Sequence, residues 1–229
     1  MPHQLTFDLP SRTALGRDDF FVSPANALAL TTVEDWANWP AGKLVLVGPK
    51  GAGKTHLVHV WAAKTGALVL DGPMLAPVDI AQIVEQNRHI AVENADQIGG
   101  DSECESQLFH LHNLLLAEGG RLLVTAKSMP AQWGLTLPDL LSRMQASNVT
   151  TLNPPDDALL AAVMVKLFSD RQIAVLPNVI AYLVSRMERS FDGAQHLVAA
   201  LDSAAFSQGR PITQRFAATV LDKLSPDAP

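Results

Sequence analysis

Cysteine, aromatic residues and long apolar runs are scarce in this sequence. Cys104 is the only cysteine among 229 residues, which excludes disulfides within the chain and is typical of a reducing compartment. No apolar run reaches the roughly 18 residues that a membrane-spanning helix needs. The first residues do not combine a basic stretch with an apolar one, so we expect no secretory signal. These absences predict a cytoplasmic protein that makes no contact with a membrane.

Charge is scarce as well, and it is slightly acidic. Charged residues make up 17% of the chain, with 17 basic against 23 acidic residues and a net charge of −6. This balance argues against a protein that wraps nucleic acid through bulk charge. Hydrophobic residues make up 48%, which is too many for a disordered chain of such modest net charge. The length allows one large or two small domains.

Short apolar runs alternate with helical patterns over the first two thirds of the chain. Runs that are apolar at every position indicate strands buried on both faces, as in a parallel sheet. The expected strands cover residues 44–47, 68–70, 90–92, 122–124 and, more weakly, 149–152. The helices expected between them cover residues 55–64, 78–86 and 103–118. This alternation predicts an α/β layer sandwich with a mostly parallel sheet.

The pattern changes after Pro154 and Pro155. Four apolar stripes with helical spacing follow, separated by turn signals and without a strand signal. We therefore expect a small helical domain from about residue 157 onward. Its seven basic and seven acidic residues balance, so the net charge of the chain lies entirely in residues 1–156.

A glycine-rich stretch joins the first expected strand to the first of the helices expected between the strands. It reads Gly48, Pro49, Lys50, Gly51, Ala52, Gly53, Lys54 and Thr55, and it matches the pattern G-x-x-x-x-G-K-[ST]. Glycines let backbone N–H groups surround phosphate oxygens, and the following helix points its positive end at the same anion. Lys54 adds a charge for the terminal phosphates, and the Thr55 hydroxyl suits Mg²⁺. The stretch predicts a nucleotide phosphate site.

An acidic residue ends the third expected strand. P-loop enzymes usually place an aspartate there to support Mg²⁺, and many follow it with a glutamate that activates water. Here Glu93 keeps a carboxylate, but Asn94 cannot accept a proton and is a poor general base. We expect nucleotide binding to survive this change and hydrolysis by the chain alone to be weak.

Five stretches share features with one known family. They are Phe21-Val22 ahead of Asn26, Gly48 to His56, Glu93-Asn94 ahead of Gly99-Gly100-Asp101, Leu122 to Thr125 ahead of Ser128-Met129-Pro130, and Leu140 to Arg143. In these stretches the chain resembles the DnaA group of AAA+ ATPases, and within that group it resembles the short Hda type. The resemblance runs from about residue 4 to residue 224. The glycine-rich stretch is shared by P-loop proteins in general, and the Asn26 box with Arg143 narrows the match to this group.

The resemblance implies a fold and its boundaries. It implies a P-loop AAA+ three-layer sandwich whose five-stranded parallel sheet has the order 5-1-4-3-2, followed by a small all-α lid. The implied parts are an N-terminal tail at 1–19, a nucleotide-binding α/β domain at 20–156 and a helical lid at 157–229. ADP or ATP, with Mg²⁺, would lie between the last two.

The resemblance also implies roles for single residues. The nucleotide would be bound by Phe21, Val22, Asn26, the loop from Gly48 to Thr55, and His56. Thr55 and Glu93 would hold Mg²⁺. The candidates for catalysis are Glu93, Asn94, Thr125 and Arg143, the last of which would reach a nucleotide on a neighbouring DnaA subunit. The lid arginine of the family has no clear counterpart, because Gly193, Ala194 or Gln195 stands at its place.

Partners follow from the same resemblance. The segment with Gln4, Leu5, Phe7 and Leu9 looks like the peptide by which this type binds the DNA polymerase sliding clamp. The DnaA initiator is the second expected partner, and a homodimer is possible through the same arginine geometry. DnaA proteins continue into a helix-turn-helix domain after the lid, whereas this chain ends at Pro229, so we expect no direct sequence-specific DNA binding.

Three functions stay open on the sequence. The first is a regulator that, with the DNA-loaded clamp, stimulates ATP hydrolysis by DnaA and so inactivates it. The second is a loader or chaperone-type ATPase that cleaves its own ATP and acts on a replication partner. The third is an adaptor without nucleotide chemistry, against which the intact Lys54 and Thr55 argue.

Overall fold

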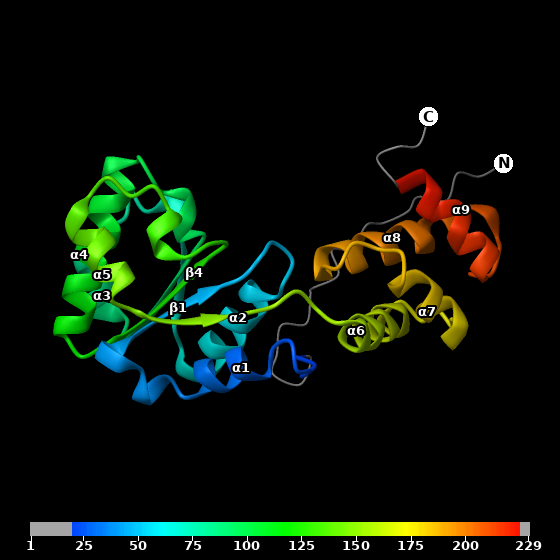
Figure 1. The fold of residues 1–229 in the computed structure, drawn as a ribbon, viewed down its shortest axis with the longest axis horizontal. Helices are drawn as coiled ribbons and strands as arrows, with labels where there is room; N and C mark the ends of the chain where they lie inside the picture. Colours follow the sequence, from blue (N-terminus) through cyan, green and yellow to red (C-terminus); the bar gives the residue numbers. More distant parts are fainter. Residues whose placement is uncertain (1–19, 225–229) are drawn as a thin grey trace.

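The computed structural model describes residues 20–224, and Figure 1 shows their arrangement. Five strands form one sheet: β1 (Lys43–Val47), β2 (Leu68–Asp71), β3 (His89–Glu93), β4 (Arg121–Ala126) and β5 (Asn148–Thr151). Five α-helices accompany them: α1 (Ala27–Glu34), α2 (Lys54–Thr65), α3 (Ile80–Gln86), α4 (Ser102–Ala117) and α5 (Pro138–Gln145). Short 3-10 turns join several of these elements: η2 (Trp36–Asn38), η3 (Pro40–Gly42), η4 (Gly72–Met74), η5 (Ala95–Gln97) and η6 (Pro130–Gln132).

The sheet has the expected topology. Its strand order is β2-β3-β4-β1-β5, which is the expected order read from the other edge, and all four pairings are parallel. In the centre, Val45 of β1 lies between Val124 of β4 and Val149 of β5. The carboxyl ends of all strands therefore meet at one edge, where the loop after β1 lies beside the ends of β4 and β5.

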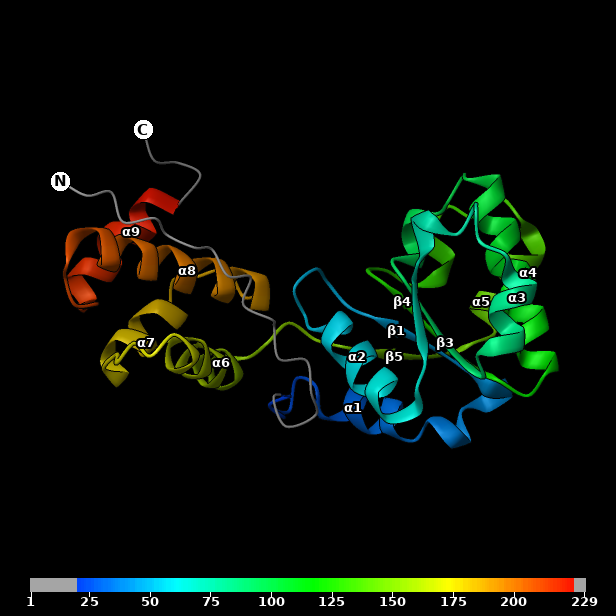
Figure 2. The same cartoon turned by 180° about the vertical axis from the view of Figure 1, so that it is seen from behind.

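The two faces of the sheet bury different side chains of the same strands. Along β1, Val45 and Val47 pack in one core with α3, α4 and α5, whereas Leu44 and Leu46 pack in another with α1 and α2. Both faces of β1 are closed to solvent, since all four of these residues are at most 6% exposed. This double burial is why the strands read as continuous apolar runs, and it gives the expected three layers (Figure 2).

The helices after β5 form a bundle with its own core. They are α6 (Asp157–Asp170), α7 (Pro177–Val184), α8 (Phe191–Gln208) and α9 (Gln214–Leu224). Each expected apolar stripe forms one of these helices, and residues such as Phe168, Leu201 and Val220 meet in the core they share. Ser190 caps α8 by accepting a hydrogen bond from the Gly193 N–H at 2.9 Å. We call α6–α9 the helical bundle.

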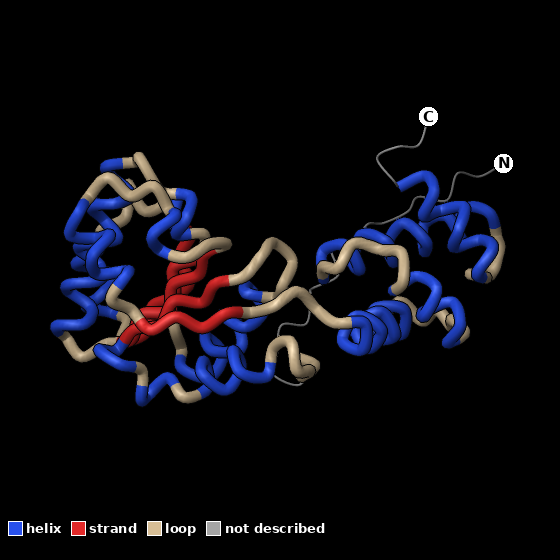
Figure 3. Tube along the Cα trace, viewed as in Figure 1, coloured by secondary structure: helices blue, strands red, loops and turns tan. Residues whose placement is uncertain are grey.

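The helical bundle stands beside the carboxyl edge of the sheet. Figures 1 and 3 show that the segment after β5 leads directly into α6, so the loop after β1 faces the bundle. Within residues 20–224, no helix is long and apolar enough to cross a membrane.

Candidate nucleotide-binding site

The loop after β1 has a backbone that only glycine adopts easily. We call residues 48–55 the phosphate loop. Gly51 has φ +71° and Gly53 has φ +97°, in the left-handed region. The Gly48 N–H donates to the Ala126 carbonyl at 3.1 Å, and a Cβ on Gly48 would lie 2.5 Å from the Leu152 carbonyl oxygen. The loop is thus held between the ends of β4 and β5, and it feeds into the positive end of α2.

Lys54 lies at the start of α2 with its ammonium folded back over the loop. Its Nζ donates to the Gly48 carbonyl at 2.6 Å and to the Pro49 carbonyl at 2.9 Å. Burial lowers the pKa of Lys54, and the positive charge of Lys127 lowers this pKa further. The negative charges of Asp96, Glu93 and Asp192 act in the opposite direction on the same pKa, with that of Asp96 the strongest. These four charged residues therefore surround the ammonium that is expected to meet phosphate.

Thr55 and Glu93 are brought together. The Thr55 hydroxyl donates to Glu93 Oε1 at 2.7 Å, which joins the start of α2 to the carboxyl end of β3. A hydroxyl and a carboxylate beside a phosphate loop are oxygen ligands of the kind Mg²⁺ prefers. The donor set fits a Mg²⁺–nucleotide, with remaining ligands supplied by water and phosphate.

Asn94 directly follows β3, and Thr125 lies near the carboxyl end of the neighbouring strand β4. Asn94 has φ +56°, and its amide donates to Asp71 Oδ1 at 2.8 Å, so it is directed toward β2 and away from the phosphate loop. Its backbone N–H points at Thr125 Oγ1, 3.4 Å away. Thr125 is 1% exposed, so its hydroxyl is buried among the neighbouring strands.

The segment before α1 is folded around Asn26. Its side chain accepts from the Ser23 N–H at 2.9 Å and donates to the Phe21 carbonyl at 2.8 Å. Both hydrogen bonds of this buried amide lie within the turn, so Asn26 stabilises the conformation of the segment. The side chains of Phe21 and Val22 are exposed. His56 of α2 lies beneath it, edge-on to the Phe20 ring with 5.1 Å between ring centroids.

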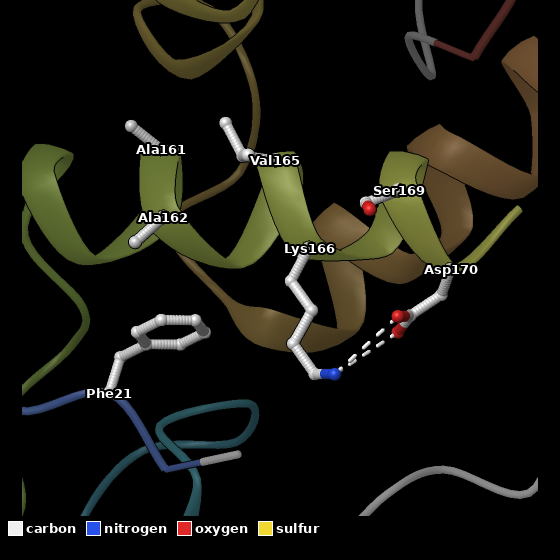
Figure 4. Close-up of a pocket in the computed structure, with 7 residues that line it drawn as sticks. All are labelled: Phe21, Ala161, Ala162, Val165, Lys166, Ser169 and Asp170. Carbon is white, nitrogen blue, oxygen red and sulfur yellow. Dashed lines mark hydrogen bonds and ion pairs between the residues drawn. The ribbon is translucent and has the colours of Figure 1, made fainter. Parts of the chain in front are cut away.

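An open hollow lies between this segment and the bundle. It has a volume of about 530 Å³ and is lined by Phe21 and by one side of α6. Figure 4 shows the Phe21 ring facing Ala162, with the ion pair of Lys166 and Asp170 further along the helix. A flat apolar ring and small aliphatic side chains suit a planar base.

The helical bundle touches the phosphate loop itself. The Phe191 N–H at the start of α8 donates to the Gly51 carbonyl at 2.9 Å. A Cβ on Gly51 would stand 2.5 Å from the Ser190 Cβ, and one on Gly53 would stand 2.9 Å from the Phe191 ring. The first turn of α8 therefore rests on the loop, and only glycine leaves room for it.

We predict that Gly51→Ala destabilises the protein by about 1–3 kcal/mol, because φ +71° strains any side chain and Ser190 blocks the new methyl group. Thermal unfolding measures the change in stability, and titration with a fluorescent ADP analogue measures the affinity of the site. The matched control is Gly66→Ala, at φ +72° with no atom within 4 Å of the added carbon. Equal effects of the two variants on binding would show that contact with the bundle is unimportant to the site.

Two arginines that precede α8 make their contacts within the bundle. Arg189 forms an ion pair with Asp157 at 2.6 Å, and the Arg186 guanidinium lies 4.1 Å from the centre of the Tyr182 ring. The bundle residue whose charge reaches Lys54 is Asp192, in the first turn of α8.

Arg143 lies at the opposite edge of the sheet. It is in the last turn of α5, and its carbonyl accepts from Lys43 Nζ at 2.7 Å. Lys43 is 6% exposed, begins β1 and also lies 3.1 Å from His112 Nε2. β1 runs about 13 Å from Lys43 to Val47. The structure therefore does not bring Arg143 together with the phosphate loop of its own chain.

Three charged residues near the loop, Asp96, Lys127 and Asp192, were not among the sequence candidates. Asp96 follows Glu93 by three positions, and Asp192 follows the cap of α8 by two. An acidic residue just beyond a strand end is the signal that could have marked Asp96. The clamp-binding candidates Gln4, Leu5, Phe7 and Leu9 lie outside the described residues.

No family model matches the chain. Its structure is similar to domain III of the replication initiation protein DnaA from Thermotoga maritima, with a TM-score of 0.79 and 17% identity, covering 91% of this chain and 96% of that one. DnaA from Aquifex aeolicus bound to AMPPCP has a TM-score of 0.69 at 16% identity, covering 83% and 65%. A RuvB variant from Thermotoga maritima has a TM-score of 0.69 at 17% identity, covering 91% and 72%. The chain therefore has the AAA+ fold that DnaA and RuvB share.

Proposed function

We propose that this chain is an adenine-nucleotide-binding AAA+ regulator of replication initiation in the cytoplasm. Residues 20–156 would form the nucleotide-binding domain and residues 157–229 the lid. The nucleotide's phosphates would lie on the phosphate loop beside Lys54, and its base would lie near Phe21 and Val22. Thr55 and Glu93 would hold Mg²⁺, which would offset phosphate charge. Support comes from the loop geometry and from the AMPPCP bound to a DnaA of the same fold.

The observation that carries the regulatory part is the position of Arg143. Its guanidinium is exposed at the amino edge of the sheet, while the phosphate loop lies at the carboxyl edge. If an arginine placed so acts on a nucleotide, that nucleotide is bound to another subunit, where the fixed charge and forked donors of the arginine suit a transferring phosphate. We therefore assign Arg143 the role of an arginine finger acting in trans on ATP bound to DnaA.

The route to DNA is the second part of the proposal. We expect the peptide with Gln4, Leu5, Phe7 and Leu9 to bind the sliding clamp, with the glutamine forming hydrogen bonds and the apolar side chains filling a pocket. A chain with net charge −6 has no bulk attraction for DNA, so a clamp already on DNA would bring it to its target.

One reconstitution tests both parts. DnaA loaded with ATP, the clamp on DNA and this chain are mixed, and phosphate release is measured for wild type, Arg143→Ala and Gln4→Ala. We expect wild type to accelerate hydrolysis, Arg143→Ala to return it to the rate of DnaA alone, and Gln4→Ala to lose stimulation and clamp retention together.

Arg186→Ala is the matched control, because that arginine is also exposed but lies over the Tyr182 ring within the bundle. It should stimulate like wild type. The regulatory proposal fails if wild type gives no stimulation, and the tethering proposal fails if Gln4→Ala binds the clamp unchanged.

A second candidate function is a loader or chaperone-type ATPase that cleaves its own ATP. The pairing of Thr55 with Glu93 at 2.7 Å beside Lys54 favours it, because these groups are arranged for a metal-bound nucleotide in the same chain. Robust ATP turnover by the purified chain without DnaA would support this function over the first.

A further inference from the structure

A lysine is buried at the amino end of β1. Lys43 is 6% exposed, although lysine is almost never fully buried unless it is paired. Its Nζ donates to the Arg143 carbonyl at 2.7 Å and lies 3.1 Å from His112 Nε2. A carbonyl oxygen and an imidazole nitrogen are neutral partners, and the cost of burying a cation is high. Replacing buried ionic groups by apolar ones is often neutral or stabilising, so stability alone is a weak reason for this lysine.

The hydrogen bonds around Lys43 have one consistent direction. An ammonium has only donors, so His112 Nε2 accepts, and the ring proton lies on Nδ1, 3.0 Å from Asn113 Oδ1. Burial lowers the pKa of His112, and the charges of Lys43 and Arg143 lower it further. The hydrogen bond with Asn113 raises this pKa without offsetting these effects. The neutral ring therefore orients the ammonium toward the carbonyl of Arg143.

The carbonyl that Lys43 binds is one that the end of a helix leaves unpaired. Arg143 lies in the last turn of α5, where carbonyls lack partners within the helix. The Lys43 ammonium is one donor to this carbonyl, and the Ser147 hydroxyl is a second at 3.0 Å. At the other end of α5, the buried Glu105 carboxylate accepts from the Leu137 N–H at 2.6 Å. Each end of α5 is thus bound by a buried charge of the sign that the helix dipole favours.

Lys43 binds the backbone of Arg143 and leaves its side chain exposed. Burial lowers the pKa of Lys43, and the like charge of Arg143 lowers it further. The same repulsion acts on the guanidinium, which it directs away from the buried ammonium and toward solvent. Lys43 therefore fixes the backbone from which the guanidinium projects and does not compete for its donors.

We propose that Lys43 is a positioning residue for Arg143, which it serves by holding the last turn of α5 in the place from which the guanidinium reaches a nucleotide on DnaA. This inference rests on the proposed action of Arg143 on DnaA and deepens it. A displacement of about 1 Å at a reacting group can cost about 100-fold in rate. A helix end fixed by a buried cation limits such displacements.

The experiment measures ATP hydrolysis by ATP-loaded DnaA, with the clamp on DNA, at increasing concentrations of the full chain. Lys43→Met keeps the length of the side chain and removes its charge and donors. We expect this variant to lower the maximal stimulation by about 10- to 100-fold, because Arg143 is present but misplaced. The concentration that gives half of the maximal stimulation should stay like that of wild type. Lys43→Arg keeps a charge and donors for the carbonyl, so it should restore most of the stimulation.

Arg121→Met is the matched control. Arg121 begins β4, the strand beside β1, and donates to the carbonyls of Trp36 and Ala37 instead of α5. This variant should stimulate like wild type, and thermal melts of both variants separate loss of folding from loss of position. If Lys43→Met does not fold, His112→Phe replaces it, because it removes the acceptor that orients the ammonium. A smaller loss of maximal stimulation is then expected.

The outcomes separate this inference from the proposed function. A wild-type chain that does not stimulate DnaA refutes the proposed function and the inference with it. If wild type stimulates, an equal maximal stimulation by folded Lys43→Met overturns the inference alone. An equal loss in Arg121→Met, or a loss that appears only as a higher half-maximal concentration, also overturns it. A lower maximum at an unchanged half-maximal concentration, restored by Lys43→Arg, supports it.

Discussion

Glu105→Ala is expected to lower the free energy of unfolding by about 3–5 kcal/mol, the largest effect of any single side chain considered for stability. Glu105 of α4 is fully buried. Its carboxylate accepts from the backbone N–H groups of Gly100 at 2.8 Å, Thr136 at 2.9 Å and Leu137 at 2.6 Å. Leu137 is the N-cap residue of α5, so the variant leaves three backbone N–H groups without their acceptor and loosens the helix that carries Arg143.

Urea denaturation of the two proteins measures this change, and Glu103→Ala is the control. Glu103 lies in the same first turn of α4, but its side chain is exposed. The control should lose at most about 1 kcal/mol, from its favourable place near the helix dipole. Similar midpoints for Glu105→Ala and wild type would contradict the role given to the carboxylate.

The same carboxylate predicts how stability depends on pH. Burial by itself raises the pKa of Glu105, but the hydrogen bonds from Thr136, Leu137 and Gly100 outweigh it and hold the pKa below its ordinary value. A lowered pKa in the folded state contributes stability above the unfolded value of about 4.3, which is lost as pH falls through the folded value. Glu105→Ala should therefore differ most from wild type near neutral pH and least in strong acid.

Lys54→Ala is expected to weaken nucleotide binding by about 10- to 100-fold, the equivalent of one or two charge-assisted hydrogen bonds. Lys54 is the cation at the start of α2 that can leave the carbonyls of Gly48 and Pro49 for phosphate oxygens. Titration with a fluorescent ADP analogue gives the dissociation constants. Raising the salt concentration should narrow the gap between the variant and wild type.

Lys64→Ala serves as the control for Lys54→Ala, because it removes a lysine from the exposed last turn of the same helix. Its affinity should match that of wild type. An unchanged affinity of Lys54→Ala would remove the phosphate loop from the proposed function, whatever the result with Arg143.

The sheet could be predicted because its information is local. The strand through Val45 is apolar at each position, and alternate residues fill two cores, so burial on both faces marks it directly. The glycine pattern around Gly51 is local for the same reason, since left-handed backbone selects glycine. The four helices of the bundle were predicted from stripes of apolar residues with helical spacing.

The surroundings of the site could not be predicted in this way, because they depend on contacts distant in sequence. Ser190 meets Gly51 across 139 positions, and no pattern in either segment encodes this meeting. In the sequence, Asn94 stands where many P-loop enzymes have a catalytic acid. In the structure, its amide donates a hydrogen bond to Asp71. Asn26 reads as a ligand-binding residue, yet its amide is occupied within its own turn.

The hydrogen bond between Phe191 and Gly51 joins the first turn of α8 directly to the phosphate loop. The 18 residues of this helix span about 27 Å. A rotation of about 10° around the first turn would carry its far end by about 5 Å. A movement of the loop that rotated α8 by this much would therefore displace Gln208 far enough for a neighbouring molecule to detect.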